Sequence, residues 1–424
     1  MQKIKFCFLF SFFLIAFNPY YINTYLIGQF QTGGLVRVTF GIVSLALFGL
    51  FALYEMFNRN KFDYLYKRNF ISISMLSLLI INCLVLISSI NTRNYLIAGT
   101  DFFPIFILTL SYFVFLIILS YENNFKLLYY SLIFWALIIV LFDSAHYIIS
   151  FLLNYSYARM HVVDDYSFNR LPDLSYAVLM SLIVPFVLSK KIINLILVIQ
   201  LIILSSFISI ISLWKTLMLS GIIMLLFGIL LFAKKIKDLN WKIIVIIVTL
   251  SATTLSTLIN TIDTENFSNV FEERIVVAAD ISEVQSRTYS TRIEDWLDTI
   301  NIFKENFILG AGFGDFQLSQ TNSQNFYLAD TSNYFARLLG YFGIFGLIYP
   351  LMLCYLFFKS INLLKYLDEE DIKKKIIYSI IISSAAIIPI LIAFPSLVYF
   401  PISLILGLNF AYLSNISLRL ESKN

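Results

Sequence analysis

Apolar runs close to twenty residues long recur along almost the whole of this 424-residue chain, and they constrain its fold more than any other feature. A helix needs about 20 apolar residues to cross a hydrocarbon core of roughly 30 Å. The runs do not alternate between apolar and polar residues, as the strands of a membrane barrel do. The sequence therefore predicts an all-α, polytopic integral membrane protein.

The composition agrees with a membrane protein. The chain is 59% hydrophobic and 13% charged, whereas soluble proteins are about 45–50% apolar and about 25% charged. Lys3 and Lys5 precede an apolar run, as in a signal peptide, but no small-residue cleavage site follows. We therefore interpret this run as the first membrane helix. Three cysteines fall inside apolar runs and are predicted to be buried hydrophobic residues: Cys7, Cys83 and Cys354.

Hydropathy divides the chain into twelve predicted membrane spans within a single membrane domain, 1–424. They are 4–24, 35–57, 70–90, 102–120, 127–150, 174–189, 192–211, 214–233, 241–262, 334–358, 376–394 and 397–415. The apolar stretch 192–233 is too long for one span, so we predict a tight turn near 212–213.

The distribution of charge predicts the orientation in the membrane. With a cytoplasmic N-terminus, most of the 30 basic residues fall at cytoplasmic ends and loops, and most of the 26 acidic residues fall on the other side. This asymmetry follows the positive-inside rule. It predicts that both termini are cytoplasmic and that two large loops, 151–173 and 263–333, lie on the outer face. We expect the chemistry on that face.

The loop 263–333 contains a predicted amphipathic helix over residues 291–306. Its apolar residues recur every three or four positions and include Trp296, Leu297 and Ile300, so we expect it to lie flat on the membrane surface. Three glycines follow it: Gly310, Gly312 and Gly314. They predict a tight turn or a close approach to another group, and the turn either forms a phosphate-binding nest or is a re-entry turn packed on the bilayer. A second glycine series, Gly340, Gly343 and Gly346, predicts a close helix-packing face.

Signatures of soluble nucleotide-binding and zinc enzymes are missing from the sequence. It has no phosphate-binding loop of the Walker type, no dinucleotide fingerprint, no paired CxxC and no HExxH. Its two histidines exclude a histidine-rich metal site. Asp263 and Glu265 leave an acidic metal pair as a minor alternative. We predict no cofactor, no metal and no nucleic-acid partner.

Cations on the outer face are the remaining candidates for chemistry. They are Arg93, Arg159, Arg170, Lys215, Arg274, Arg287, Arg292 and Arg337. An arginine binds phosphate through two parallel hydrogen bonds. Such cations could hold the pyrophosphate of a polyprenyl-linked substrate and stabilise charge on the leaving group without a metal. Each one also fits a role in topology or packing. Lys215 and Arg337 lie at the edges of spans, where a charge needs a partner or a wet cavity.

Five segments together resemble the O-antigen ligase/polymerase superfamily. The first holds Arg292 and Trp296, the second is 306–316 with its glycines, and the third is Ser332–Phe335. An earlier segment, 204–219 with Lys215, resembles the family's Ser-Arg-containing turn, and Arg170–Asp173 resembles the segment before it. The resemblance covers roughly 168–350. It implies a protein of the bacterial inner membrane that transfers glycans from undecaprenyl pyrophosphate at the periplasmic face.

Two residues depart from the pattern of the ligases in that superfamily. Ser332 stands where the ligases carry a histidine, and Lys215 stands where they carry an arginine. The missing histidine favours a Wzy-type O-antigen polymerase, which joins undecaprenyl-pyrophosphate-linked repeat units. The alternatives are an O-antigen ligase that transfers the glycan to lipid A-core, and a transporter or flippase.

The resemblance also implies a set of site residues. The predicted pyrophosphate ligands are Arg292, Lys215, Arg170, Arg337 and Arg159. Asp330 or Asp173 is the predicted general base, with His161 as a weaker candidate. The expected partners are undecaprenyl-pyrophosphate-linked glycans, the lipid bilayer and a chain-length regulator in the same membrane.

Overall fold

The computed structural model describes the helical parts of the chain and a few short connections. The described residues are 2–17, 33–59, 69–89, 95–152, 181–185, 192–211, 215–236, 240–260, 297, 299–313, 334–368, 371–393 and 400–421. Every regular element within these ranges is a helix, as the sequence predicts. The chain divides into two compact units: unit 1 is 1–131, 287–363 and 391–424, and unit 2 is 132–286 and 364–390.

Five described helical segments are long and apolar enough to cross a membrane. They are Phe70–Ser88, Phe102–Leu119, Glu122–Leu141, Tyr334–Tyr366 and Ile372–Ile392. Shorter apolar helices cover Ile42–Asn58, Leu195–Leu204, Met218–Ala233 and Trp241–Thr254. The protein is therefore consistent with a polytopic membrane protein, and the number of twelve spans stays a prediction.

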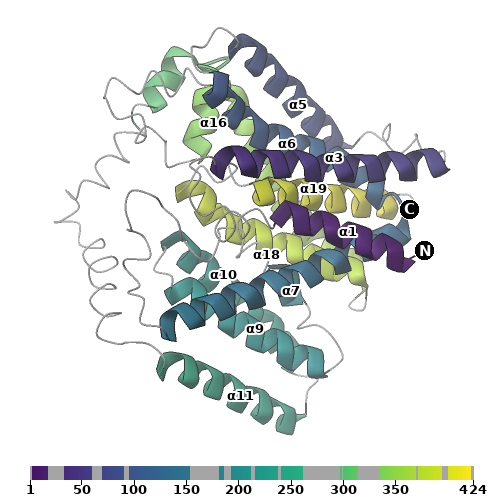
Figure 1. Ribbon diagram of the computed structural model, residues 1–424, viewed down its shortest axis with the longest axis vertical. Helices are drawn as coiled ribbons and strands as arrows, with labels where there is room; N and C mark the ends of the chain where they lie inside the picture. The colour runs from purple at the N-terminus through teal and green to yellow at the C-terminus, as the bar shows by residue number, and fades with distance from the viewer. Residues whose placement is uncertain are drawn as a thin grey trace, which may run out of the picture. The chain divides into compact units, whose positions relative to one another are not determined.

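Unit 1 is built mainly from the two ends of the chain (Figure 1). Its helices are α1 (Gln2–Phe17), α3 (Gly33–Arg59), α5 (Phe70–Ser88), α6 (Tyr95–Leu119), α16 (Tyr334–Phe342), the 3-10 helix η4 (Gly343–Leu347), α17 (Ile348–Leu363) and α19 (Phe400–Glu421). The helix α7 (Glu122–Leu152) begins in this unit. The C-terminal helix α19 packs against α6, α3, α5, α17 and α1. It is buried along 402–417 and forms the centre of the unit.

The closest approach between α19 and α6 occurs at a glycine. A Cβ at Gly407 would overlap the Ser111 side chain and would lie 2.8 Å from the Leu108 carbonyl oxygen. Small residues let membrane helices approach closely enough for backbone contact. Gly407 therefore allows α19 to lie deep against α6.

Polar side chains join helix ends of unit 1 that are far apart in sequence. Lys5 on α1 forms a buried ion pair with Glu55 on α3. Arg419 donates from Nη2 to the carbonyl oxygens of Leu119, at 3.1 Å, and Ser120, at 3.2 Å. The last carbonyls of α6 lack partners within their own helix, and a cation there is also favoured by the helix dipole. Asn415 donates to the Leu119 oxygen at 2.8 Å as well.

Unit 2 contains a three-helix group. Its members are α9 (Ile192–Ile211), α10 (Lys215–Ile236) and α11 (Trp241–Asn260). The unit also holds the rest of α7, a 3-10 turn η5 (Leu364–Tyr366) and most of α18 (Ile372–Ala393). The helix α9 packs against both α10 and α11. The apolar stretch 192–233 is divided into two helices, because α9 ends at Ile211 and α10 begins at Lys215; the turn predicted near 212–213 lies outside the described residues.

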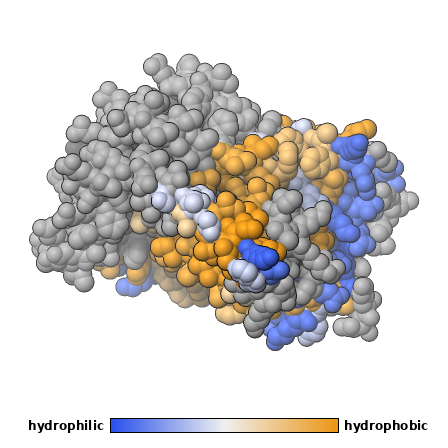
Figure 2. Space-filling model, turned by 90° about the horizontal axis from the view of Figure 1, so that it is seen from below, coloured by the Kyte–Doolittle hydropathy of each residue, from blue (hydrophilic) through white to orange (hydrophobic). Residues whose placement is uncertain are grey.

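Apolar side chains on the outside of the helices identify the surfaces that face lipid. Along α5, exposed apolar residues recur every three or four positions from Phe70 to Ile87, which marks one face of the helix. Seen from the side at which Figure 1 draws α11, the protein has a broad hydrophobic area with hydrophilic residues along one margin (Figure 2). The prediction that the three cysteines are buried is wrong, because Cys7 and Cys354 are exposed on their helices and Cys83 is partly exposed.

Candidate functional site

The glycine turn that follows the predicted amphipathic helix belongs to unit 1. Residues 299–305 are helical, and the chain then turns through 306–309. Gly310 and Gly312 adopt φ angles of +75° and +87°. This left-handed region is costly for residues that carry a Cβ. The sequence needs glycine at both positions because no other residue adopts these angles without strain.

The backbone amides of this turn are bonded to protein acceptors. The amide of Gly310 donates to the Asn306 oxygen at 2.9 Å, and that of Ala311 donates to the Gly340 oxygen at 2.7 Å. The amide of Phe313 donates to Ser89 Oγ at 2.8 Å. A phosphate nest needs successive amides that point at the anion. The amides of Gly310, Ala311 and Phe313 are already bonded to protein acceptors and do not form such a nest.

A second glycine, Gly343, meets the turn from the other side. It has a φ of +58° and lies where α16 ends and η4 begins. A Cβ at Gly343 would lie 2.5 Å from the Phe307 oxygen, and one at Gly310 would overlap the Tyr341 carbonyl. The amide of Ile344 donates to the Phe307 oxygen at 2.8 Å. Two backbone segments are thus in direct contact, with a glycine on each side.

This contact corrects the expected role of the second glycine series. Gly343 interrupts the helix, so the predicted span 334–358 is not one regular helix. A Cβ at Gly346 would overlap the Leu338 carbonyl of α16. Gly343 therefore leaves space for the loop turn beside the break in the helix. Gly346 lets the stretch after the break fold closely against α16.

Phe313 closes the turn with an apolar anchor. Its side chain is fully buried, and its ring packs against Phe102, Tyr341 and Phe342 at centroid distances of 6.0, 5.2 and 5.4 Å. Edge-to-face pairs of this kind are worth about 0.5–1.5 kcal/mol each beyond the area they bury. The rings and the Ser89 hydrogen bond together fix the end of the turn to α5, α6 and α16.

A buried cation lies on α16 beside this cluster. Arg337 is only 5% exposed. Its Nε donates to the Tyr341 hydroxyl at 2.5 Å, and its guanidinium lies 5.5 Å from the centre of the same ring. A charge at the centre of a membrane helix costs about 2.5–3.5 kcal/mol on insertion scales. The tyrosine, one turn further along the helix, offsets part of that cost.

Two more tyrosines of this region are buried. Within the described residues, the hydroxyls of Tyr334 and Tyr349 have no hydrogen-bond partner. Both residues line an internal cavity of about 20 Å³, together with apolar residues such as Met75 and Leu108. That volume has room for about one water molecule. The two hydroxyls therefore keep hydrogen-bonding capacity inside the unit.

Apolar side chains are exposed on the opposite side of the turn. They are Leu297, Ile300, Phe307, Ile308 and Leu309. Three of them are consecutive and come immediately before Gly310. An exposed apolar group this dense is typical of a membrane-facing segment. Within the predicted range 291–306, residues 297 and 299–305 are helical, and the position of this helix at the membrane surface stays a prediction.

Most of the predicted site residues lie outside the described part of the chain. These are Arg159, His161, Arg170, Asp173, Arg292, Gly314 and Asp330, so their roles stay predictions. Lys215 is the first residue of α10, and its side chain is not described. Arg337 is the one predicted phosphate ligand whose side chain is described. No group of three or more His, Cys, Asp or Glu side chains within the described ranges is arranged to hold a metal.

Three residues that the structure places at or beside the turn are absent from the predicted site, and two of them, Ser89 and Phe102, have no functional signal in the sequence. Ser89 Oγ accepts a hydrogen bond from the Phe313 amide, and the Phe102 ring packs on the Phe313 ring. The Tyr341 hydroxyl accepts a hydrogen bond from Arg337. Ser89 ends an apolar run and resembles any helix-terminal serine in sequence. Tyr341 differs from these two, because it follows Arg337 by four residues, and this spacing places both side chains on one face of a helix.

Comparison with known families connects this region to a biosynthetic class. Residues 175–351 match the family described as O-antigen ligase. The matched range includes α9–α11, the glycine turn, α16 and η4. The match supports the O-antigen ligase/polymerase superfamily, whose members are glycosyltransferase-like enzymes of lipopolysaccharide biosynthesis, without separating polymerase from ligase. No curated protein matches the chain.

Proposed function

We propose that this protein is an O-antigen polymerase that joins undecaprenyl-pyrophosphate-linked repeat units at the periplasmic face of the bacterial inner membrane. The family match over 175–351 is the observation that carries the proposal. The described helices support it, because an enzyme that uses a lipid-linked donor needs a membrane-embedded body. Ser332, in place of the histidine expected in ligases, favours the polymerase over the ligase.

The proposed reaction transfers the growing glycan to the next repeat unit. A sugar hydroxyl of the incoming unit attacks the anomeric carbon of the growing chain. The new carbon–oxygen bond forms as the bond to the pyrophosphate breaks, and the lipid pyrophosphate leaves with the electron pair. Asp330 or Asp173 takes the hydroxyl proton, with His161 as the weaker candidate. Cations stabilise the charge on the leaving pyrophosphate.

The pyrophosphate ligands in this proposal are Arg292, Lys215 and Arg170, with Arg337 and Arg159 in supporting positions. Arginine and lysine differ here, because the guanidinium presents a planar pair of donors and the ammonium is a point charge. Arg337 is buried, and its Nε donates to the Tyr341 hydroxyl, which fixes the position of its guanidinium.

Replacement of Arg292 by alanine tests the assignment most directly. We expect Arg292→Ala to reduce the lipopolysaccharide ladder on a gel to core plus one repeat, because the leaving group loses its principal counter-charge. Arg274→Ala, in the same loop, is the matched control and should keep a normal ladder. A normal ladder from Arg292→Ala at normal protein level would remove this residue from the site.

Deletion of the gene separates the polymerase from the ligase. Loss of a polymerase leaves core plus one repeat on the lipopolysaccharide, because the ligase still transfers single units. Loss of a ligase leaves bare core. The ligase remains the second candidate because the matching family is described by that activity, and a bare-core phenotype would establish it.

A further inference from the structure

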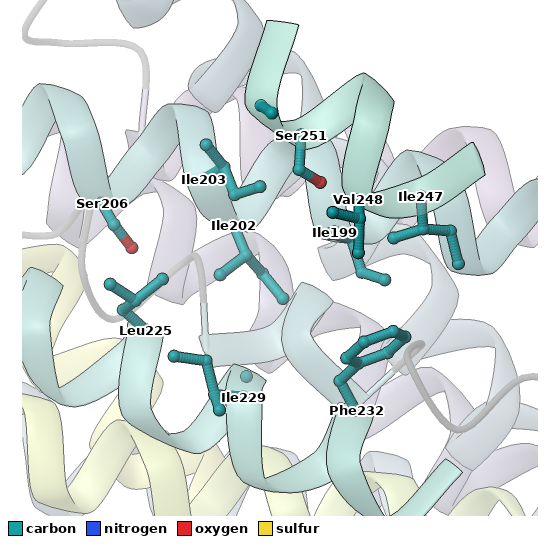
Figure 3. Close-up of a pocket in the computed structure, with 12 residues that line it drawn as sticks. Ile199, Ile202, Ile203, Ser206, Leu225, Ile229, Phe232, Ile247, Val248 and Ser251 are labelled. Atoms are coloured by element: carbon teal, nitrogen blue, oxygen red, sulfur yellow. The ribbon is translucent and has the colours of Figure 1, made fainter. Parts of the chain in front are cut away.

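A large apolar groove lies in unit 2 between the helices α9, α10 and α11. Its volume is about 460 Å³, within the roughly 300–1,000 Å³ of small-molecule sites. Side chains from all three helices point into one space, among them Ile202 and Ile203 of α9, Leu225 and Phe232 of α10, and Val248 of α11 (Figure 3). The groove is therefore formed by three helices together.

Hydrogen bonds hold these three helices at fixed spacings. Gln200 of α9 donates to Ser251 of α11 at 3.3 Å and accepts from Thr254 at 2.6 Å. Ser206 of α9 donates to the Gly221 oxygen of α10 at 3.3 Å. Gly228 of α10 lets Ile202 approach, because a Cβ there would lie 3.1 Å from that side chain. Hydrogen bonds therefore join α9 to α11 on one side of the groove and to α10 on the other.

The lining excludes a polar ligand. Ser206 and Ser251 are its two polar residues, and both hydroxyls are bonded to neighbouring helices. The same helices carry exposed apolar side chains outside the groove, including Leu226, Leu230 and Ile246. In a membrane these side chains face hydrocarbon. The groove therefore opens towards lipid and suits a hydrocarbon chain.

The helix α10 links the groove to a cation. It begins at Lys215, and its first groove residue, Leu225, follows ten positions later. At a rise of about 1.5 Å per residue, these positions are roughly 15 Å apart along the helix. A helix N-terminus with a lysine favours a phosphate group. A lipid phosphate bound near Lys215 would extend its chain along α10 into the groove.

We propose that this groove holds the isoprenoid chain of the polyprenyl-pyrophosphate donor. The inference rests on the proposed function, which supplies a donor with one long chain below a pyrophosphate. A polyprenyl lipid has a single chain that one groove can take, whereas a phospholipid must leave its second chain outside. Occupation of the groove positions the pyrophosphate at the start of α10 before the glycan reacts.

Photo-crosslinking in lipid nanodiscs tests the proposal without turnover. The probe is a polyprenyl pyrophosphate with a benzophenone placed along its chain at roughly 15 Å from the pyrophosphate, the distance that separates the start of α10 from the groove. A phosphatidylethanolamine with benzophenone in an acyl chain is the comparison. We expect the polyprenyl probe to label peptides of α9–α11 and unlabelled polyprenyl pyrophosphate to compete. Labelling of the groove by the phospholipid probe without such competition would overturn the proposal.

Two valines on α11 provide a matched pair of variants. Val248 lines the groove and is 56% exposed, whereas Val245 is 51% exposed and lies outside the lining. We expect Val248→Phe to lower labelling by the polyprenyl probe about tenfold and Val245→Phe to leave it unchanged. Equal labelling of the two variants would contradict the proposal.

A second pair guards against failure to fold. Ala252→Phe fills the groove from another position, and Ala233→Phe is its control on the exposed surface of α10. Each variant is first checked for monodisperse elution and for its melting temperature.

The groove and the proposed function can be disproved independently of each other. The proposed function is wrong if Arg292→Ala and gene deletion leave the glycan ladder intact while the groove is still labelled. The groove fails if the ladder depends on Arg292 but the polyprenyl probe labels other helices.

Discussion

Single polar groups in unit 1 show why the partner of a buried side chain matters more than its residue type. Tyr341 accepts a hydrogen bond from a buried guanidinium, whereas Tyr349 is equally buried and its hydroxyl has no partner in the described structure. A hydrogen bond to a charged group contributes about 1.5–3 kcal/mol, and a buried hydroxyl without a partner is a liability. The same substitution should therefore have opposite effects at the two positions.

Removal of each hydroxyl tests this contrast. We expect Tyr341→Phe to destabilise the protein by about 1.5–3 kcal/mol, because the Nε of the buried Arg337 guanidinium loses the hydroxyl to which it donates. Tyr349→Phe should be neutral or slightly stabilising. Melting temperatures in detergent, followed by size-exclusion fluorescence, compare the two. Equal destabilisation of the two variants would show that the Arg337–Tyr341 hydrogen bond contributes no more to stability than the Tyr349 hydroxyl does.

At the scale of elements, the contact between the glycine turn and the α16–η4 break is the central feature. Gly310 and Gly343 both have positive φ, and each lies against the backbone of the other segment. Membrane helices usually meet through side chains, but here a loop turn and a helix break meet through main-chain groups and two hydrogen bonds. The contact holds the described turn, 306–313, against the break between α16 and η4.

A single methyl group should break this contact. In Gly310→Ala the left-handed backbone is strained by about 1–2 kcal/mol, and the new Cβ overlaps the Tyr341 carbonyl. We expect a loss of well over 2 kcal/mol in stability and faster proteolysis of the loop 263–333, measured by limited trypsin digestion. Gly49→Ala is the control.

Gly49→Ala is a suitable control because an added Cβ has space at this position. Gly49 lies within α3 and has no atom within 4 Å of its added Cβ. Alanine there should stabilise the helix by up to about 1 kcal/mol. A Gly310→Ala protein as stable as the Gly49→Ala protein would show that the turn tolerates a side chain.

At the scale of the whole molecule, distant parts of the sequence meet where the predicted topology places them on one side. Lys5 contacts Glu55, and Arg419 contacts Leu119 and Ser120. The charge distribution assigns all of these helix ends to the cytoplasmic side. On the other side, the Phe313 turn meets the end of α5 and the early part of α6. The contacts within unit 1 are thus consistent with the predicted alternation of its spans.

Labelling from outside the cell tests the orientation itself. After replacement of the three native cysteines by alanine, Lys304→Cys should react with a membrane-impermeant maleimide in cells with a permeabilised outer membrane. Lys373→Cys, in the predicted cytoplasmic loop, should react only after lysis. Both residues are described: Lys304 is exposed, and Lys373 is partly exposed. The reverse pattern would invert the topology and move the proposed site to the cytoplasmic face.

The sequence alone determined the features that depend on local composition. Apolar length predicted the helices, including the separation of α9 and α10 near 212–213. Glycine spacing located the turn at 310–314, because positive φ and close backbone approach are requirements of single residues. Motif spacing identified the superfamily that the match over 175–351 supports. Hydropathy did not separate lipid-facing from buried helices, because every membrane-embedded helix is apolar.

Only the tertiary structure decided which residues meet. Ser89 and Phe313 are 224 positions apart, and no local pattern pairs them. The central position of α19, the pairing of Gly310 with Gly343 and the groove between α9, α10 and α11 depend on how whole helices pack. Such contacts form because small residues and hydrogen bonds allow close approach at particular places. Hydropathy is a property of one segment, whereas a contact is a property of two.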